Sequence, residues 1–134
     1  MIEVTCARVD VDVVHRFLSE ESYWAQGITR ERVERAIAHS IPFSAFEGGA
    51  QIGFARVISD RATFAYLADV FVLPSHRGRG IARKIMEAIF AHPELQELRR
   101  WMLVTRDAHA LYEQFGFRAL AAPERHMERR AAAK

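Results

Sequence analysis

The segment TFAYLADVFVLPSHRGRGIARKIMEAI, residues 63–89, joins the most strand-like part of the chain to a helical run. Residues 63–73 are apolar on both faces except for Asp69, which is typical of a strand inside a sheet. Pro74 ends this strand, and a helix is expected from about Gly78 to His92. The segment therefore predicts a strand, a tight turn and a helix in direct succession.

The turn HRGRGIAR, residues 76–83, combines two glycines with three arginines. A helix N-terminus presents unpaired backbone N–H groups, and glycine lets a ligand approach them closely. The amides of residues 78–82 are therefore candidates to hold a phosphate, with charge-assisted contacts from Arg77, Arg79 and Arg83. The alternative is an ordinary glycine turn with solvated arginines. A nucleoside-triphosphate loop is excluded because no Gly-Lys-Ser/Thr ending follows, and a dinucleotide fingerprint lacks its third glycine at Arg83.

Length and composition favour one globular domain over residues 1–134, with a tail that frays from about residue 129. The net charge of +2 is too small to indicate a nucleic-acid partner by itself. One cysteine, Cys6, excludes an internal disulfide and is expected to be a small core residue. A reducing compartment, the cytoplasm, fits this cysteine usage and the lack of a visible secretory signal or membrane-spanning run.

Hydrophobic periodicity places further elements on both sides of the opening segment, and together they predict an α+β domain. The expected strands are residues 2–9, 41–47, 50–59 and 99–105, with one or two more from 117–123 and around His126. Gly48 and Gly49 supply a hairpin turn. The other expected helices begin after Asp10, Thr29 and Asp107, and Gly116 closes the last of them.

Two motifs of this sequence resemble those of the GNAT family of N-acetyltransferases. The stretch VFVLPSHRGRGIARKIMEAI, residues 70–89, is similar to the acyl-coenzyme A signature Gln/Arg-x-x-Gly-x-Gly/Ala, met by Arg77, Gly80 and Ala82. The stretch AHALYEQFGF, residues 108–117, is similar to the pattern Ala-x-x-x-Tyr-x-x-x-Gly-Phe, met by Ala108, Tyr112, Gly116 and Phe117. The resemblance implies a mixed, mostly antiparallel central sheet of six to seven strands flanked by about four helices.

The resemblance also implies acetyl-CoA as co-substrate and no metal. Its pyrophosphate would lie on the turn, and its pantetheine arm would pair with the backbone of Phe71 and Val72, where family members have a splay beside this strand. Thr105 stands where many members have Asn, so a hydroxyl would partly replace that cofactor contact. The cofactor-binding residues implied in this way are Phe71, Val72, Arg77, Gly78, Arg79, Gly80, Ile81, Ala82, Thr105 and Ala108.

Direct transfer to an amine is the implied chemistry, with a backbone N–H near residues 70–72 polarising the acetyl carbonyl. Tyr112 is the candidate general acid for the departing thiolate, because a phenol stays protonated at neutral pH; its alternative is a core ring. Asp69 is the candidate base through water, or a holder of the substrate's cation. Its alternative is a structural carboxylate bonded to backbone amides or to Arg56. Strand alternation turns Asp69 away from the cofactor unless the strand is bulged.

Trp24 and Tyr66 are the candidate acceptor-site residues, Tyr66 because it shares the parity of Val70 and Val72. Core packing is the alternative for most of the aromatic residues near the expected pocket, with Trp24 in its polar loop as the exception. The acceptor is expected to be a small-molecule or protein amine, with no nucleic acid or membrane as partner. A homodimer is an expectation at the family level. A module that binds acyl-CoA without catalysis, as a sensor or partner domain, is the competing interpretation.

Overall fold

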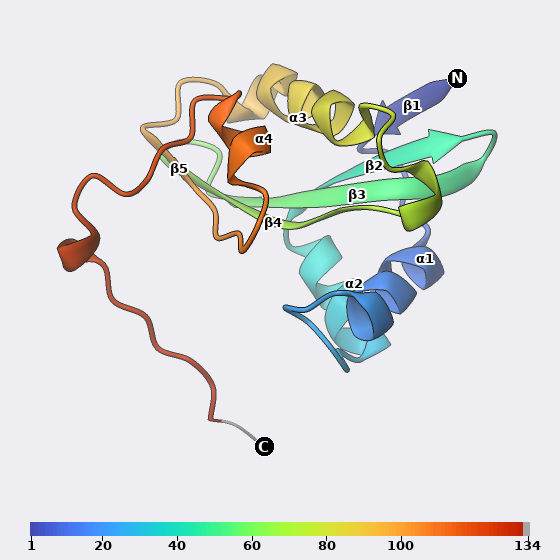
Figure 1. Ribbon diagram of the computed structural model, residues 1–134, viewed down its shortest axis with the longest axis horizontal. Helices are drawn as coiled ribbons and strands as arrows, with labels where there is room; N and C mark the ends of the chain where they lie inside the picture. The colour runs from blue at the N-terminus through green and yellow to red at the C-terminus, as the bar shows by residue number, and fades with distance from the viewer. Residues whose placement is uncertain (133–134) are drawn as a thin grey trace. The chain divides into compact units, whose positions relative to one another are not determined.

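The computed structural model describes residues 1–132 of the chain. The chain divides into two compact units, Met1–Val104 and Thr105–Lys134. The first unit carries the sheet and three of the four α-helices, and the second carries the fourth (Figure 1).

A five-stranded sheet forms the centre of the first unit, in the order β1-β2-β3-β4-β5. Its strands are β1 (Ile2–Thr5), β2 (Ile41–Glu47), β3 (Ala50–Ser59), β4 (Phe64–Val72) and β5 (Arg100–Met102). Neighbouring strands are antiparallel except β4 and β5, which are parallel. Gly48 and Gly49, both at positive φ, form the predicted two-residue turn between β2 and β3. The prediction of a mixed, mostly antiparallel sheet is confirmed.

The predicted six to seven strands are wrong, because residues 1–132 contain five. The segment expected to add the last strands instead forms a 3-10 turn, Pro123–Arg125, within irregular backbone. Pro123 lacks the N–H that a ladder needs, and the alanines of residues 119–122 have weak strand preference. The strand predicted at 99–105 is shorter and less buried than expected, since β5 spans only Arg100–Met102 and is at least partly exposed.

Three helices cover the sheet of the first unit. They are α1 (Val11–Arg16), which continues into a π-helical turn (Phe17–Glu21), α2 (Arg30–Ala38) and α3 (Ile81–Ala91). The carboxylate of Asp10 accepts from the Val13 amide, and the Thr29 hydroxyl accepts from the Arg32 amide. Both predicted N-caps are therefore confirmed.

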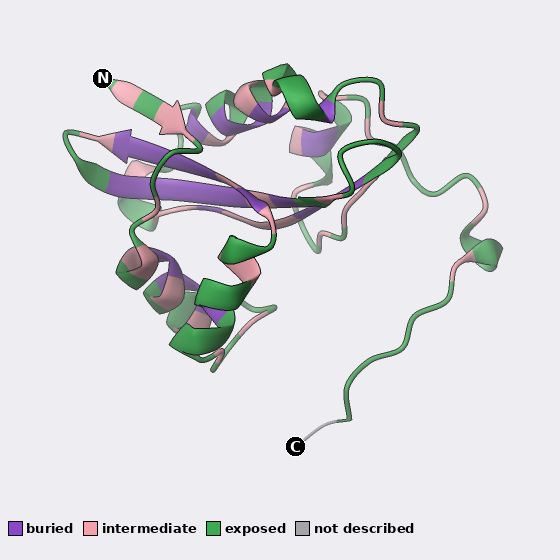
Figure 2. Cartoon of the chain, turned by 180° about the vertical axis from the view of Figure 1, so that it is seen from behind, coloured by how far each residue is buried: buried purple, intermediate pink, exposed green. Residues whose placement is uncertain are grey.

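Adjacent residues of β3 face opposite layers of this unit. A Cβ on Gly53 would meet Ile81 and Ile85 of α3, whereas Phe54 packs with Val14 and Val33 of α1 and α2. Figure 2 shows the buried residues running along the middle strands and along the sheet-facing sides of these helices. Helix α3 thus covers one face of the sheet, and α1 with α2 covers the other.

The second unit begins at Thr105 and contains α4 (His109–Glu113). Gly116 has φ of 91°, and the Phe117 amide donates to the Tyr112 carbonyl while the Gly116 amide donates to that of Glu113. This pair of bonds is a Schellman motif, which confirms that Gly116 closes the helix. Asp107 does not cap it; the N-cap position is Ala108, without a capping side chain.

Cys6 and the last described residues lie outside the helices and strands. Cys6 follows the end of β1 and is exposed, so the expected core position is wrong, because the strand stops at Thr5 instead of residue 9. Residues 128–132 form no helix or strand and are exposed. Across residues 1–132, no helix combines the length and apolarity needed to cross a membrane. The same residues contain no group of three His, Cys, Asp or Glu side chains placed to hold a metal ion.

Candidate active site

Strand β4 has a strand partner on both edges along only part of its length. Strand β5 pairs with residues 64–66 alone, whereas β3 pairs with β4 from Ala65 to Val72. Residues 67–72 therefore have no β5 partner on their other edge. Backbone groups on such an edge are available to an extended ligand in the manner of an added strand.

A β-bulge interrupts β4 in the part that β5 does not reach. Arg56 pairs with Ala68 and Phe54 with Phe71, so Asp69 and Val70 together oppose Ala55. Asp69 has φ of 55°, a left-handed conformation that costs free energy in a residue other than glycine. The strand is therefore bulged at the carboxylate, the one condition under which alternation allows Asp69 to face the site.

The bulge also changes which β4 residues share a face. Because Phe54, Arg56 and Ile58 alternate on one side of β3, their partners Phe71, Ala68 and Tyr66 lie on that same side of β4. This is the α1–α2 face, on which the Phe71 ring stacks against Phe17 at 4.0 Å between centroids. The expectation that Tyr66 shares a face with Val72 is wrong, since the extra residue inverts the alternation between them.

The Asp69 carboxylate accepts hydrogen bonds through both oxygens. Arg56 Nε donates to Oδ2 at 2.6 Å, and the Trp24 indole Nε1 donates to Oδ1 at 2.8 Å. The Arg56 and Asp69 side chains are 17% and 12% exposed, so the ion pair is largely shielded from water. The bond to Arg56 is a contact that we expect if Asp69 is a structural carboxylate and not a base. The Trp24 bond brings together two predicted site residues, Asp69 and Trp24, which lie 45 positions apart.

The turn between β4 and α3 has two left-handed glycines. Gly78 has φ of 78° and Gly80 has φ of 74°, and among residues 1–132, apart from the chain neighbours, no atom lies within 4 Å of a Cβ placed on either. Within residues 1–132, no side chain caps α3; its first backbone bond runs from the Lys84 amide to the Gly80 carbonyl. The amides at the start of α3 therefore point out of the helix, at the positive end of its dipole. Ile81 is buried and fixes the helix start against the sheet.

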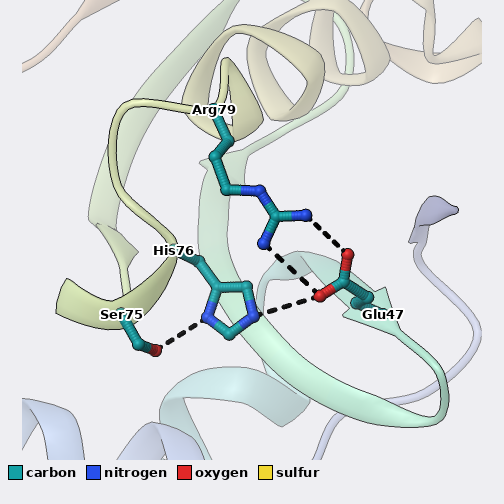
Figure 3. Close-up of polar contacts among 4 residues, drawn as sticks. All are labelled: Glu47, Ser75, His76 and Arg79. Carbon is teal, nitrogen blue, oxygen red and sulfur yellow. Dashed lines mark hydrogen bonds and ion pairs between the residues drawn. The ribbon is translucent and has the colours of Figure 1, made fainter.

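The arginines of the turn have protein partners in this structure. Arg79 donates to both oxygens of Glu47, at 2.8 and 3.5 Å, and His76 Nε2 lies 3.2 Å from the same carboxylate (Figure 3). The guanidinium of Arg79 and then the His76 ring hold the pKa of Glu47 below its usual range. Arg77 Nε donates to the Val72 carbonyl, tying the turn back to β4.

Glu47 is a neighbour of the turn that sequence reasoning missed. It ends β2, about thirty positions before its partners, and only the pairing of β2 with β3 brings it to the turn. Nothing in the local sequence around an acidic residue at a strand end predicts a contact with a turn about thirty positions later. Arg83, in contrast, has Glu87 one helical turn away at 3.8 Å, a pairing readable from the i,i+4 spacing.

The remaining predicted residues lie in the second unit. Thr105 Oγ1 accepts from the Ala108 amide at 3.1 Å, so this hydroxyl serves the backbone at the start of α4. Tyr112 is 8% exposed, and its ring lies edge-on to Phe117 at 6.0 Å between centroids. Burial of the ring agrees with either interpretation of Tyr112, as an acid or as a core residue.

Two sequence comparisons with known proteins point to the same family. Residues 38–119 match a family model described as an acetyltransferase (GNAT) domain. The chain is 30% identical over 135 residues to the Gibberella zeae protein named "Putative acetyltransferase FG08082", covering 84% of this chain and 75% of that protein.

Solved structures show the same similarity. The crystal structure of a GNAT-family protein of Xanthomonas campestris pv. campestris has a TM-score of 0.96 and 50% identity, over 98% of this chain and 94% of the other. A predicted acetyltransferase of Clostridium acetobutylicum, solved with acetyl-CoA, has a TM-score of 0.67 at 19% identity, over 95% of this chain and 100% of the other, and shows the shared fold.

Proposed function

The chain belongs to the GNAT family of acetyltransferases, and from that premise we propose that it moves the acetyl group of acetyl-CoA directly to a primary amine. The observation that carries this proposal is the continuous segment from β4 to α3. It offers a strand edge at residues 67–72 that β5 does not pair and, after it, a helix start without a side-chain cap behind two left-handed glycines. An extended arm that ends in a pyrophosphate needs these two features in this order.

In this proposal the backbone of Phe71 and Val72 pairs with the pantetheine arm. The amides from Gly78 to Ala82 hold the pyrophosphate, and Arg77 and Arg79 add positive charge. Thr105 and Ala108 are the further cofactor contacts expected from the family pattern.

The bulge supports the proposed handling of the acetyl carbonyl. Asp69 and Val70 share one partner residue on β3, so the ladder is interrupted at these two residues, at the start of the stretch 70–72 whose N–H groups are proposed to meet the carbonyl oxygen. A fixed N–H stabilises the negative charge that grows on this oxygen as the amine attacks. Tyr112 then protonates the thiolate as it leaves, since a phenol ordinarily carries a proton at neutral pH. No acyl-enzyme is required.

The proton that the amine loses has two proposed routes, through Asp69 by way of water or directly to solvent. Trp24 and Tyr66 are proposed to contact the acceptor, a small-molecule or protein amine. The lone cysteine supports a proposed cytoplasmic setting. Self-association as a homodimer remains a proposal drawn from the family.

Calorimetric titration with acetyl-CoA, its dephospho analogue and its desulfo analogue tests the cofactor site. We expect micromolar or tighter binding that Gly80→Asp weakens by at least tenfold, because a carboxylate at the helix start repels phosphate. Gly27→Asp is the matched control: its φ is 76° and its Cβ also meets nothing within 4 Å, but it lies in another loop. Equal weakening by both variants, or no binding at millimolar acetyl-CoA, contradicts the proposal.

An amine panel then tests catalysis through release of free coenzyme A thiol. The panel contains phenethylamine, tryptamine, spermidine and a lysine-containing peptide. Thiol release that depends on one of these amines, and that falls about 100-fold or more in Tyr112→Phe at unchanged acetyl-CoA affinity, supports Tyr112 as the acid. Tight binding of acetyl-CoA without amine-dependent release supports the non-catalytic acyl-CoA-binding module.

A further inference from the structure

The Asp69 carboxylate is occupied by protein donors on both sides. An ionised carboxylate has only acceptor sites, and here a guanidinium holds one oxygen while an indole N–H holds the other. A base must reach the proton it removes within a hydrogen bond or through one water. Taking that proton would neutralise the carboxylate and leave the Arg56 guanidinium without its counter-charge in a pair that is largely shielded from solvent.

Trp24 is exposed and yet tightly held. Trp24 is 42% exposed. The centroid of its ring lies 5.0 Å from the centroid of the Tyr23 ring and 6.4 Å from that of the Phe17 ring. The buried Ser22 hydroxyl donates to the Leu18 carbonyl and accepts from the Ala25 amide. The loop is thus fixed on both sides of the indole.

The indole N–H is the link between this loop and the sheet. It meets Asp69 at the one residue of β4 that the bulge places in a left-handed conformation. The strain of that conformation persists only where the surroundings hold it, and two hydrogen bonds to the carboxylate do so. Arg56 balances the negative charge, so an approaching acceptor meets a neutral pair and the exposed indole ring.

We infer that Asp69 is a positioning residue: with Arg56 it holds the Trp24 indole beside the β4 bulge, and the acceptor amine contacts the ring of Trp24 and not the carboxylate. An indole face takes either an ammonium group or an apolar body. The inference rests on the proposed function for what the ring contacts. The link between Asp69 and Trp24 can be tested without any reaction.

The first experiment reads that link directly. A Trp101→Phe background leaves Trp24 as the only tryptophan. In this background we expect Asp69→Asn to raise acrylamide quenching of Trp24 about twofold, because the amide has one acceptor oxygen for two donors, and the charged Arg56 guanidinium keeps it while the indole is released. Hydrogen exchange is expected to quicken at the amides of residues 25 and 27 in Asp69→Asn and also in Trp24→Phe. Trp24→Phe keeps a ring without the N–H, so it serves if Asp69→Asn does not fold.

The second experiment uses the panel amine that is acetylated fastest. Trp24→Phe and Asp69→Asn are each expected to raise the KM for the amine about tenfold, since a hydrogen bond to a charged group is worth about one factor of ten. In both variants kcat is expected to change by a smaller factor than KM. The fall of kcat at low pH is expected to remain as in the wild type. The control is Trp101→Phe, which removes an indole from β5.

Three results overturn the inference. Unchanged quenching and unchanged exchange show that Asp69 does not hold Trp24. A fall of kcat by about 100-fold or more in Asp69→Asn, with loss of the acidic limb and normal kinetics in Trp24→Phe, makes Asp69 the base. A normal KM in both variants removes Trp24 from the acceptor site. If no amine reacts, the proposed function fails, and quenching and exchange still decide the Asp69–Trp24 link.

Discussion

At the scale of single residues, Glu47 is placed to oppose the anion that the turn is proposed to bind. Its carboxylate, 31% exposed, holds Arg79 and lies beside His76 next to the start of α3 (Figure 3). We expect Glu47→Gln to tighten acetyl-CoA binding about threefold at low salt, because the change frees Arg79 and removes a repelling charge. Calorimetry in 20–200 mM salt measures the effect, which screening should reduce as salt rises.

Glu87→Gln is the matched control for Glu47, because it also removes a carboxylate paired with an arginine near the same helix start. Equal tightening in both variants would mean that net charge alone is responsible. Weaker binding in Glu47→Gln would mean that the carboxylate holds Arg79 in its binding position.

Asp60 organises the connection between β3 and β4. One oxygen accepts from the amides of Ala62, Thr63 and Phe64, and the other accepts from the Thr63 hydroxyl. These bonds, that of the Thr63 hydroxyl first, hold the pKa of Asp60 far below its usual range. The pKa is lowered on folding, so Asp60 stabilises the fold above its unfolded pKa, and the contribution is lost as the pH falls.

We therefore expect Asp60→Asn to lower Tm at pH 7, with the difference from the wild type shrinking as the pH falls below about 4. Thermal unfolding followed by circular dichroism across this range is the measurement. Glu31→Gln, on the exposed side of α2, is the control and should leave Tm nearly unchanged. A Tm difference that is constant with pH would show that charge on Asp60 contributes nothing.

At the scale of elements, the packing of α3 on β3 depends on the absence of a side chain at Gly53. A Cβ there would lie 3.2 Å from Ile85 Cδ1 and 3.2 Å from the Phe71 carbonyl oxygen, and the carbonyl belongs to the ladder and cannot move away. We expect Gly53→Ala to cost about 1–3 kcal/mol of unfolding free energy. Urea unfolding measures it, with the exposed Ile58→Ala on the same strand as control. A neutral Gly53→Ala would show that α3 shifts without cost.

The same element scale shows where sequence reasoning succeeds. The β2–β3 hairpin follows from alternation around Gly48 and Gly49, and the α1 and α2 starts follow from Asp10 and Thr29, since each signal lies within a few residues of its effect. The succession of β4, a turn and α3 could be predicted for the same reason, and this segment carries the acyl-CoA motif.

The failures concern contacts between distant elements. The bulge in β4 depends on registry with β3, so alternation alone placed Tyr66 with Val72 on one face. The Trp24–Asp69 bond and the Glu47–Arg79 pair each join residues more than thirty positions apart. In residues 117–123 apolar and polar residues alternate too weakly to predict a strand. Whether a strand forms there also depends on a neighbouring strand to pair with, which the local sequence does not show.

At the scale of the whole molecule, we expect the chain from Phe117 onward to contribute unevenly to stability. Residues 128–132 are exposed and irregular, so we expect the removal of residues 128–134 to change Tm by less than about 1 °C, because exposed residues such as 128–132 contribute little burial of apolar surface. Removing residues 117–134 also takes away the Phe117 amide that closes α4 and the ring beside Tyr112. That deletion should lower Tm by several degrees, since it removes a helix cap and an aromatic contact.

Calorimetric unfolding of the two truncated chains beside the full chain compares their Tm values directly. A large loss from the shorter deletion would mean that the terminal residues dock on the folded protein, and equal Tm values for all three chains would mean that α4 needs neither the cap nor the Phe117 ring.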